Sequence, residues 1–248
     1  MKTLIRNTVF FILASIILLS AVTCNDTPPE ENNTVSAYFG NTLSVTAEQV
    51  WVPNYNTGKI SELFLKFDDN CNVDVIVIDN TNNPPFHIVG TGNIEEGKLS
   101  FSVNKLTENY LLDGDDLLFY CFNEWYGNGN ITVNPSDVKG NLITLVTQYD
   151  DEISMPSEGI IKEGFYGTRT SLTGEYIYYI YVDADCTISA GEVEKTDLHY
   201  TFNSFALSLK AGWNSICKSE TYTTTGDSSY SITVDNPESR WLKQEIRN

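Results

Sequence analysis

The strongest strand signal in this chain is the stretch Glu175-Tyr176-Ile177-Tyr178-Tyr179-Ile180-Tyr181-Val182. It consists almost wholly of β-branched and aromatic residues, which favour strands. Side chains of a strand alternate between its two faces, and here both faces are apolar or aromatic. A strand with one face in water would carry polar residues at every second position. The stretch therefore predicts a central strand that is buried on both sides.

Shorter strands are predicted along the rest of the chain. Leu99, Phe101 and Val103 alternate with serines, which indicates a strand with one buried face. Residues 205–209 alternate in the same way, and no stretch shows the periodicity of an amphipathic helix. Further strands are predicted at 62–67, 73–78, 87–91, 117–122, 142–148, 175–182, 213–217 and 241–242, with a hairpin at 222–234.

A short acidic stretch, 151–159, separates two strand-rich halves and contains few apolar residues. Such composition is typical of a boundary between domains. The fold class is therefore predicted as all-β, with one β-sandwich domain at 35–150, a linker at 151–159 and a second β-sandwich domain at 160–248.

The first 23 residues have the order of an export signal. Lys2 and Arg6 precede an apolar run, 9–19, and small residues lead to Cys24. The run is shorter than the roughly 20 apolar residues that span a bilayer. We predict a cleaved signal at 1–23, followed at 24–34 by a polar, acidic, proline-bearing tether.

The charge of the chain excludes one class of partner. The formal net charge is −18, and the predicted signal carries two bases and no acid, so its removal makes the mature chain still more acidic. Nucleic acids and anionic lipid surfaces require clustered lysine and arginine. We therefore expect no nucleic-acid partner.

Four cysteines follow Cys24, and an even number in an exported chain allows disulfides. The pairs Cys71–Cys121 and Cys186–Cys217 each fall within one predicted domain. The alternative is four buried thiols that pack as small apolar side chains.

The segment Gly212-Trp213-Asn214 predicts a tight turn, a core tryptophan and an amide that caps the turn. Earlier in the chain, Asp183 and Asp185, with Glu194, resemble the ligands of a calcium loop. An EF-hand loop needs glycine at its sixth position, where this chain has Ile188. The alternative is an ordinary turn at the end of a strand.

Trp125 and Tyr126 are candidates for an aromatic platform that packs against sugar rings. Core packing or loop anchoring is the alternative for them. The only histidines are His87 and His199, and no nucleophile elbow, zinc-binding or phosphate-binding motif is present. We therefore expect no catalysis and no cofactor.

Four segments resemble bacterial lipoproteins. Cys24 after small residues resembles the lipobox, in which the cysteine is lipidated and the signal is cut off before it. Val22 and Thr23 are looser than the usual box, and ordinary cleavage near Ala21 is the alternative. Residues 181–189 and 207–214 resemble spirochaete (treponemal-type) envelope lipoproteins. Residues 89–101 are similar to immunoglobulin-like lipoprotein modules.

The resemblance implies two immunoglobulin-like β-sandwich domains that are held at the bacterial cell membrane or outer membrane through lipid on Cys24. The expected function is a surface binding or structural module, with a protein or a glycan as the unknown ligand. The alternative function is a carbohydrate-binding or adhesin module that uses the aromatic and acidic loops.

Overall fold

The structure is a computed structural model, and it describes residues 33–35, 37–53, 64–79, 86–117, 131–149, 156–167, 171–195, 200–223, 227–233 and 240–245. The predicted signal and Cys24 lie outside these ranges. Asn33–Asn248 form one compact unit. Strands make up 72% of the described residues, which confirms the all-β prediction. In this part of the chain no helix has the length and apolar character needed to cross a membrane.

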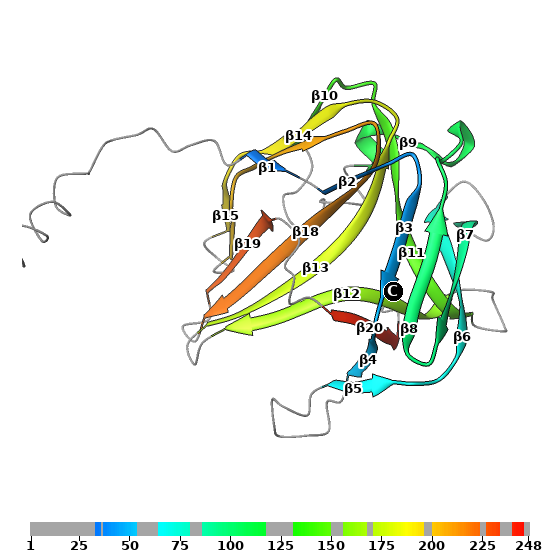
Figure 1. Ribbon diagram of the computed structural model, residues 1–248. Coiled ribbons are helices and arrows are strands. Elements are labelled where there is room, and N and C mark those ends of the chain that lie inside the picture. Colours follow the sequence, from blue (N-terminus) through cyan, green and yellow to red (C-terminus); the bar gives the residue numbers. More distant parts are fainter. Residues whose placement is uncertain are drawn as a thin grey trace, which may run out of the picture. The chain divides into compact units, whose positions relative to one another are not determined.

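Two long antiparallel strands, β13 (Ser171–Val182) and β18 (Gly212–Thr223), lie side by side at the centre (Figure 1). Their pairing runs from Ser171 opposite Thr223 to Val182 opposite Gly212. Along β13, Ile177 and Tyr179 enter one core, and Ile180 enters another. The prediction that this strand is buried on both faces is confirmed.

A large sheet extends to both sides of this central pair. Away from β13 it continues through β11 (Lys139–Tyr149), β6 (Cys71–Ile78), β7 (Phe86–Glu95), β8 (Lys98–Val103) and β3 (Leu43–Ala47). Away from β18 it continues through β19 (Ser228–Thr233), β16 (Tyr200–Phe202) and β15 (Val193–Lys195). The short β9 (Leu112–Asp113), which follows the 3-10 turn η2 (Glu108–Tyr110), pairs with the start of β11.

The sheet branches at β12 (Pro156–Gly167). Residues 140–143 of β11 pair with β13, whereas residues 145–149 pair with β12. The other half of β12 pairs with the first half of β13. From β12 the branch continues through β20 (Arg240–Glu245) and β4 (Val50–Pro53) to β5 (Phe64–Phe67).

The first core lies on one face of the central pair. β2 (Ala37–Gly40) pairs with β18. β3 begins two residues after β2 and pairs with β8 at the other end of the large sheet. The connection from β2 to β3 therefore brings that end of the sheet back to β18 (Figure 1). The buried residues of this first core include Leu43, Val75, Ile94, Phe101, Tyr179, Tyr181, Trp213, Cys217 and Trp241.

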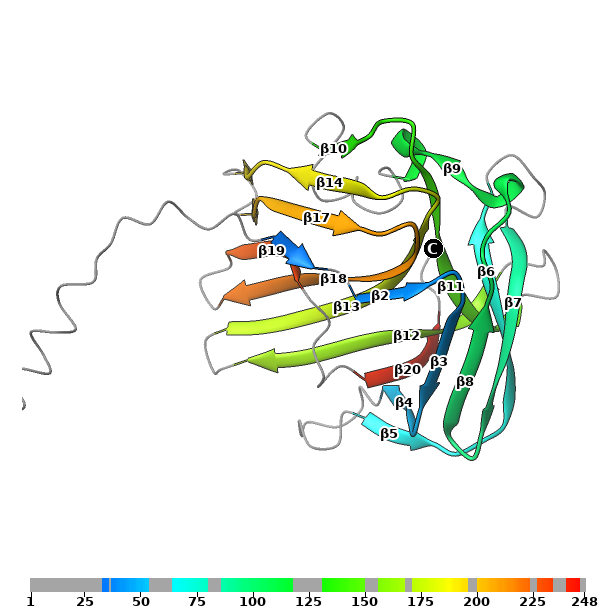
Figure 2. The ribbon, with the colours of Figure 1, turned by 45° about the horizontal axis from the view of Figure 1, so that its top comes forward.

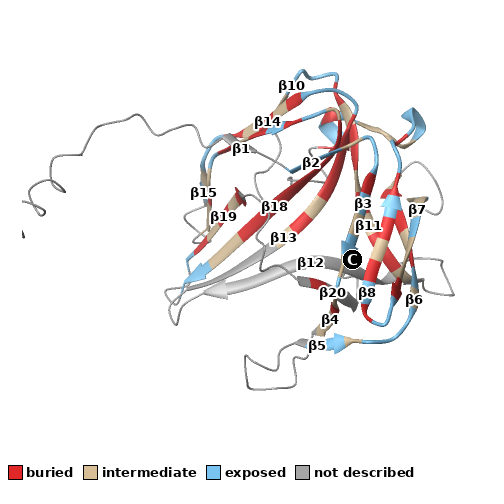
Figure 3. Ribbon diagram, viewed as in Figure 1, coloured by how far each residue is buried: buried red, intermediate tan, exposed pale blue. Residues whose placement is uncertain are grey.

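The second core lies on the opposite face, under a four-stranded sheet. Figure 2 shows two of its strands, β17 and β14, running above the central pair, and Figure 3 shows buried residues along β13 and β18. The sheet has the order β1 (Asn33–Val35), β17 (Phe205–Leu209), β14 (Cys186–Ala190) and β10 (Ile131–Asn134). The second core includes Ile180, Val182, Cys186, Ile188, Phe202, Leu207, Leu209, Ile216 and Tyr230.

Most predicted strands correspond to strands of the structure. The alternating segments 99–103 and 205–209 are β8 and β17, and 73–78 and 142–148 lie within β6 and β11. The hairpin predicted at 222–234 is the β18–β19 pair, with Tyr222 opposite Ser228. Of the strand predicted at 117–122, the described part is Leu117, which lies in a short helical turn.

The predicted domain boundary at 151–159 falls inside the compact unit. Residues 151–155 lie outside the described ranges, and β12 begins at Pro156. β11 pairs with β6 from the first predicted domain and with β12 and β13 from the second. The two halves of the chain therefore share one hydrogen-bonded sheet.

The predicted Cys186–Cys217 disulfide is wrong. Both side chains are buried thiols, but Cys186 belongs to the second core and Cys217 to the first. Residues two apart on a strand share a face, so Cys217 lies on the same side of β18 as Trp213. The sheet itself separates the two sulfurs. Cys121 lies outside the described ranges, so the Cys71–Cys121 bridge stays a prediction.

Candidate functional site

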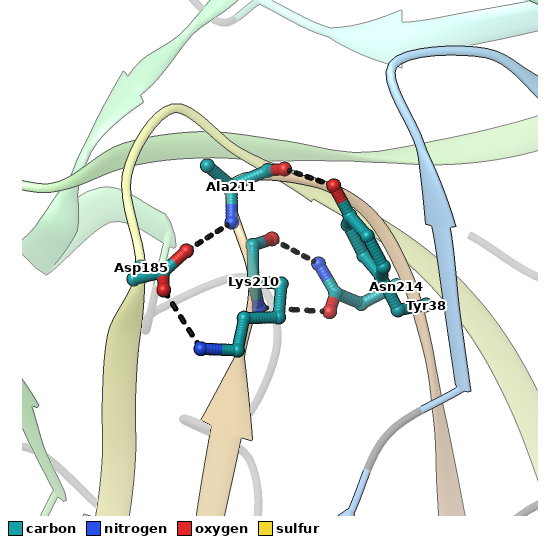
Figure 4. Close-up of polar contacts among 5 residues, drawn as sticks. All are labelled: Tyr38, Asp185, Lys210, Ala211 and Asn214. Carbon is teal, nitrogen blue, oxygen red and sulfur yellow. Dashed lines mark hydrogen bonds and ion pairs between the residues drawn. The ribbon is translucent and has the colours of Figure 1, made fainter.

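The turn between β17 and β18 gathers a set of polar contacts (Figure 4). The Asp185 carboxylate accepts a hydrogen bond from the Ala211 backbone N–H at 2.9 Å and from Lys210 Nζ at 2.8 Å. The Tyr38 hydroxyl donates to the Ala211 carbonyl at 3.0 Å. These contacts join two other segments of the chain, at Tyr38 and Asp185, to the turn.

Gly212, Trp213 and Asn214 take the roles that the sequence predicts. Gly212 has φ +117°, which favours glycine, and a Cβ there would lie 2.5 Å from the Gly40 carbonyl oxygen. Trp213 is fully buried, and its ring N–H donates to the Asn104 carbonyl at 3.3 Å.

The fully buried Asn214 side chain caps the turn. Its amide nitrogen donates to the carbonyls of Lys210, at 2.8 Å, and Gly212, at 3.0 Å. Its amide oxygen accepts from the Lys210 N–H at 3.1 Å. One side chain thus satisfies three backbone groups, as buried polar groups require.

The ion pair between Lys210 and Asp185 contributes little to the free energy of unfolding. The hydrogen bond from Lys210, followed by that from the Ala211 N–H, lowers the pKa of Asp185. The same bond raises the pKa of Lys210. Both side chains are more than half exposed, so water and salt screen the attraction between them.

Asp183 and Asp185 therefore behave as strand-end turn residues. Asp183 accepts a hydrogen bond from the Lys139 N–H at 2.9 Å, and its own N–H donates to the Lys139 carbonyl. Glu194 is on β15, in a different sheet from β14. Within the described ranges, no group of three or more His, Cys, Asp or Glu side chains is arranged to hold a metal ion.

Trp125 and Tyr126, the predicted sugar platform, lie outside the described residues, as does His199. His87 lies near one end of the β6–β7 hairpin, with its Nε2 atom 2.8 Å from Asp79 Oδ2. The Tyr110 ring lies 5.1 Å from the imidazole, measured between ring centroids. This partly exposed pair links the two strands at that end.

Cys186 lacks the character of a reactive thiol. Burial, together with the charges of Asp183 and Asp185, raises the pKa of its thiol to about 11. The reactive form of cysteine is the thiolate, which this environment disfavours at neutral pH.

A second polar group lies near the other end of the central pair, and we call it the tyrosine–glutamate cluster. It consists of Tyr176 on β13, Glu220 and Tyr222 on β18, Tyr230 on β19 and Tyr200 on β16. Tyr230 is directly opposite Glu220. Tyr222 is opposite Ser228, which pairs in turn with Tyr200.

The cluster grows out of the second core. Phe202, a core residue, stacks on Tyr230 with ring centroids 4.6 Å apart. Tyr200 meets the same ring edge-on at 5.7 Å. Exposure increases outward, from 8% at Tyr230 to 46% at Tyr222. The exposure of Glu220 is intermediate, so this residue is partly packed and partly accessible to solvent.

The carboxylate of Glu220 influences the pKa of two tyrosines in the cluster. Burial, and then a hydrogen bond to Glu220, raises the pKa of Tyr230. The same causes, in the same order, raise the pKa of Tyr222, although nearly half of that residue is exposed. A hydrogen bond from a phenol to a carboxylate favours the protonated phenol.

Sequence reasoning missed this cluster because its members come from four strands. The available signal was the alternation in Lys218-Ser219-Glu220-Thr221-Tyr222, which places a lysine, a glutamate and a tyrosine on one face. Which residues face them depends on the register of β19 and β16.

No protein-family model, curated protein or solved structure matches this chain.

Proposed function

We propose that this chain is an exported lipoprotein, anchored at the cell envelope through lipid on Cys24, whose all-β body is a binding module without catalytic activity. The observation that carries the binding role is the tyrosine–glutamate cluster. It places a partly exposed carboxylate among tyrosine rings on one face of the sheet.

The order of residues at the N-terminus supports the anchor. Basic residues, an apolar run, small residues and Cys24 are followed by an acidic tether before β1 begins at Asn33. Each buried methylene of an acyl chain contributes about 0.8 kcal/mol, and two chains hold a protein stably at a membrane. The closer relation to immunoglobulin-like spirochaete lipoproteins is part of this proposal and rests on the sequence resemblance.

Carbohydrate is the alternative ligand class. The rings of Tyr176, Tyr200 and Tyr222 would pack on sugar faces, and Glu220 would accept sugar hydroxyls. The predicted platform at Trp125 and Tyr126 belongs to the same alternative.

Replacement of Cys24 tests the anchor. A Cys24→Ala chain, expressed in a bacterial host that processes lipoproteins, is expected to leave the membrane fraction, because the thiol that carries the lipid is gone. A Cys71→Ala chain is the matched control and is expected to stay with the membrane. The measurement is the distribution of each chain between pelleted membranes and supernatant. Equal membrane retention of both variants would contradict the anchor.

A further inference from the structure

The tyrosine–glutamate cluster combines two features that favour the same kind of ligand. The first is a group of partly exposed tyrosines, Tyr176, Tyr200 and Tyr222, on the face of the sheet that carries Glu220. Tyrosine ring faces attract cations, and quaternary ammonium groups are bound by clustered aromatic rings. The second is the negative charge of the Glu220 carboxylate itself.

Two phenols share the Glu220 carboxylate. A hydrogen bond to Glu220 contributes to the raised pKa of both Tyr222 and Tyr230. These phenols take up part of the acceptor capacity of the carboxylate, which has about four lone-pair sites, so fewer acceptors remain for the hydroxyls of a sugar. A cation without hydrogen-bond donors makes no such demand, since it needs only the charge and the ring faces.

The same face of the sheet already holds one ammonium group on a tyrosine ring. Lys218 precedes Glu220 by two residues on β18 and shares its face. Its Nζ lies over the Tyr178 ring, 4.7 Å from the ring centroid. This contact is a cation–π interaction within the protein, and Lys218 lies directly opposite Tyr176 of the cluster.

The charge of the whole chain acts in the same direction. At a formal net charge of −18, the protein attracts cations and repels anions at long range. The negative electrostatic potential of the whole protein therefore adds to the attraction of a cation by Glu220.

We propose that the cluster of Tyr176, Tyr200, Glu220, Tyr222 and Tyr230 binds an alkylated ammonium cation, such as a choline-type group, against its ring faces and beside the Glu220 carboxylate. This inference rests on the binding role given above and specifies its ligand class. The sheet positions the rings, and the carboxylate balances the charge of the ligand.

The test is isothermal titration of the full-length chain, held in a non-ionic detergent, with tetramethylammonium chloride and with choline chloride. The neutral analogue 3,3-dimethylbutan-1-ol has the shape of choline without its charge. Both cations are expected to bind, and the neutral analogue is expected to bind about tenfold more weakly or worse, because it gains no cation–π attraction.

Variants locate the site. Glu220→Gln removes the charge and is expected to weaken tetramethylammonium binding about tenfold. Tyr222→Leu removes a ring and is expected to weaken it similarly, whereas Tyr222→Phe keeps the ring and is expected to retain most of the binding. Matched controls are Glu48→Gln and Tyr38→Leu, which alter exposed residues outside the cluster and are expected to leave binding unchanged. Circular dichroism and melting of each variant verify that it is folded.

The binding experiments distinguish the ammonium ligand from the more general binding role of the cluster. Binding of a sugar from a glycan panel, lost in Tyr222→Leu, without binding of either cation, would overturn the ammonium ligand and keep the binding module. Equal affinity for choline and its neutral analogue would also overturn the ammonium ligand. If neither cations nor glycans bind to the folded chain, the ammonium ligand and the binding role of the cluster both fail.

Discussion

A Trp213→Ala chain is expected to lose about 3–5 kcal/mol of unfolding free energy, the largest effect of any single change considered. Trp213 is fully buried in the first core, and its ring meets Tyr181 edge-on with centroids 5.2 Å apart. The substitution leaves a cavity and removes the hydrogen bond to the Asn104 carbonyl. Because domains are stable by only about 5–15 kcal/mol, such a loss is large enough to unfold a marginal protein.

Chemical denaturation followed by far-ultraviolet circular dichroism measures this loss. The method does not depend on the fluorescence of the tryptophan that is removed. Leu65→Ala is the control, because Leu65 is 54% exposed and its loss should change stability by no more than about 0.5 kcal/mol. If both variants unfold at the same denaturant concentration as the unaltered chain, Trp213 is not part of the core.

The second large effect is expected at Asn214. Asn214→Ala should cost about 2–4 kcal/mol, because three backbone groups of the β17–β18 turn lose their partner and a buried group left unsatisfied costs about 1–3 kcal/mol. The carbonyls of Lys210 and Gly212 lose a donor, and the Lys210 N–H loses an acceptor.

Asn214→Asp provides a sharper form of the same test. Aspartate has nearly the same shape, but it replaces the donor amide with an oxygen that faces two carbonyl oxygens. It should therefore be at least as destabilising as alanine. Asn104→Ala removes an exposed side chain that accepts from Thr42 at 3.3 Å and should have little effect. An Asn214→Asp chain as stable as the unaltered one would show that the amide does not cap this turn.

Local chemistry explains why parts of the fold were predictable. The segment 175–182 carries apolar or aromatic residues on both faces, and this pattern requires cover on both sides wherever the strand lies in the sheet. Gly212 and Asn214 act through backbone conformation and hydrogen bonding within the turn, and Trp213 acts through its size. Their roles follow from residue type and hold in the structure.

Long-range pairing explains what was not predictable. The branch at β12 depends on where β11 leaves β13, and no local signal marks that point. The division at 151–159 follows a change in composition, whereas the sheet passes across it. The predicted pairing of Cys186 with Cys217 follows from placing each disulfide within one domain. Alternation along β18 from Trp213 to Cys217 would have placed Cys217 in the first core instead.

The candidate ligand site shows the same limit. Alternation along β18 places Glu220 and Tyr222 on one face, and the sequence alone could have given this pair. Tyr230 and Tyr200 reach them only through the register of β18 with β19 and of β19 with β16. The chemistry of the cluster is therefore a property of the sheet as a whole.

The intact mass of the membrane-extracted protein decides whether the chain is an envelope lipoprotein. We expect a chain that begins at Cys24 and carries acyl groups, in which Cys186 and Cys217 do not form a disulfide with each other. An unacylated mass, with a start before or after Cys24, would contradict the anchor and identify the protein as a secreted one.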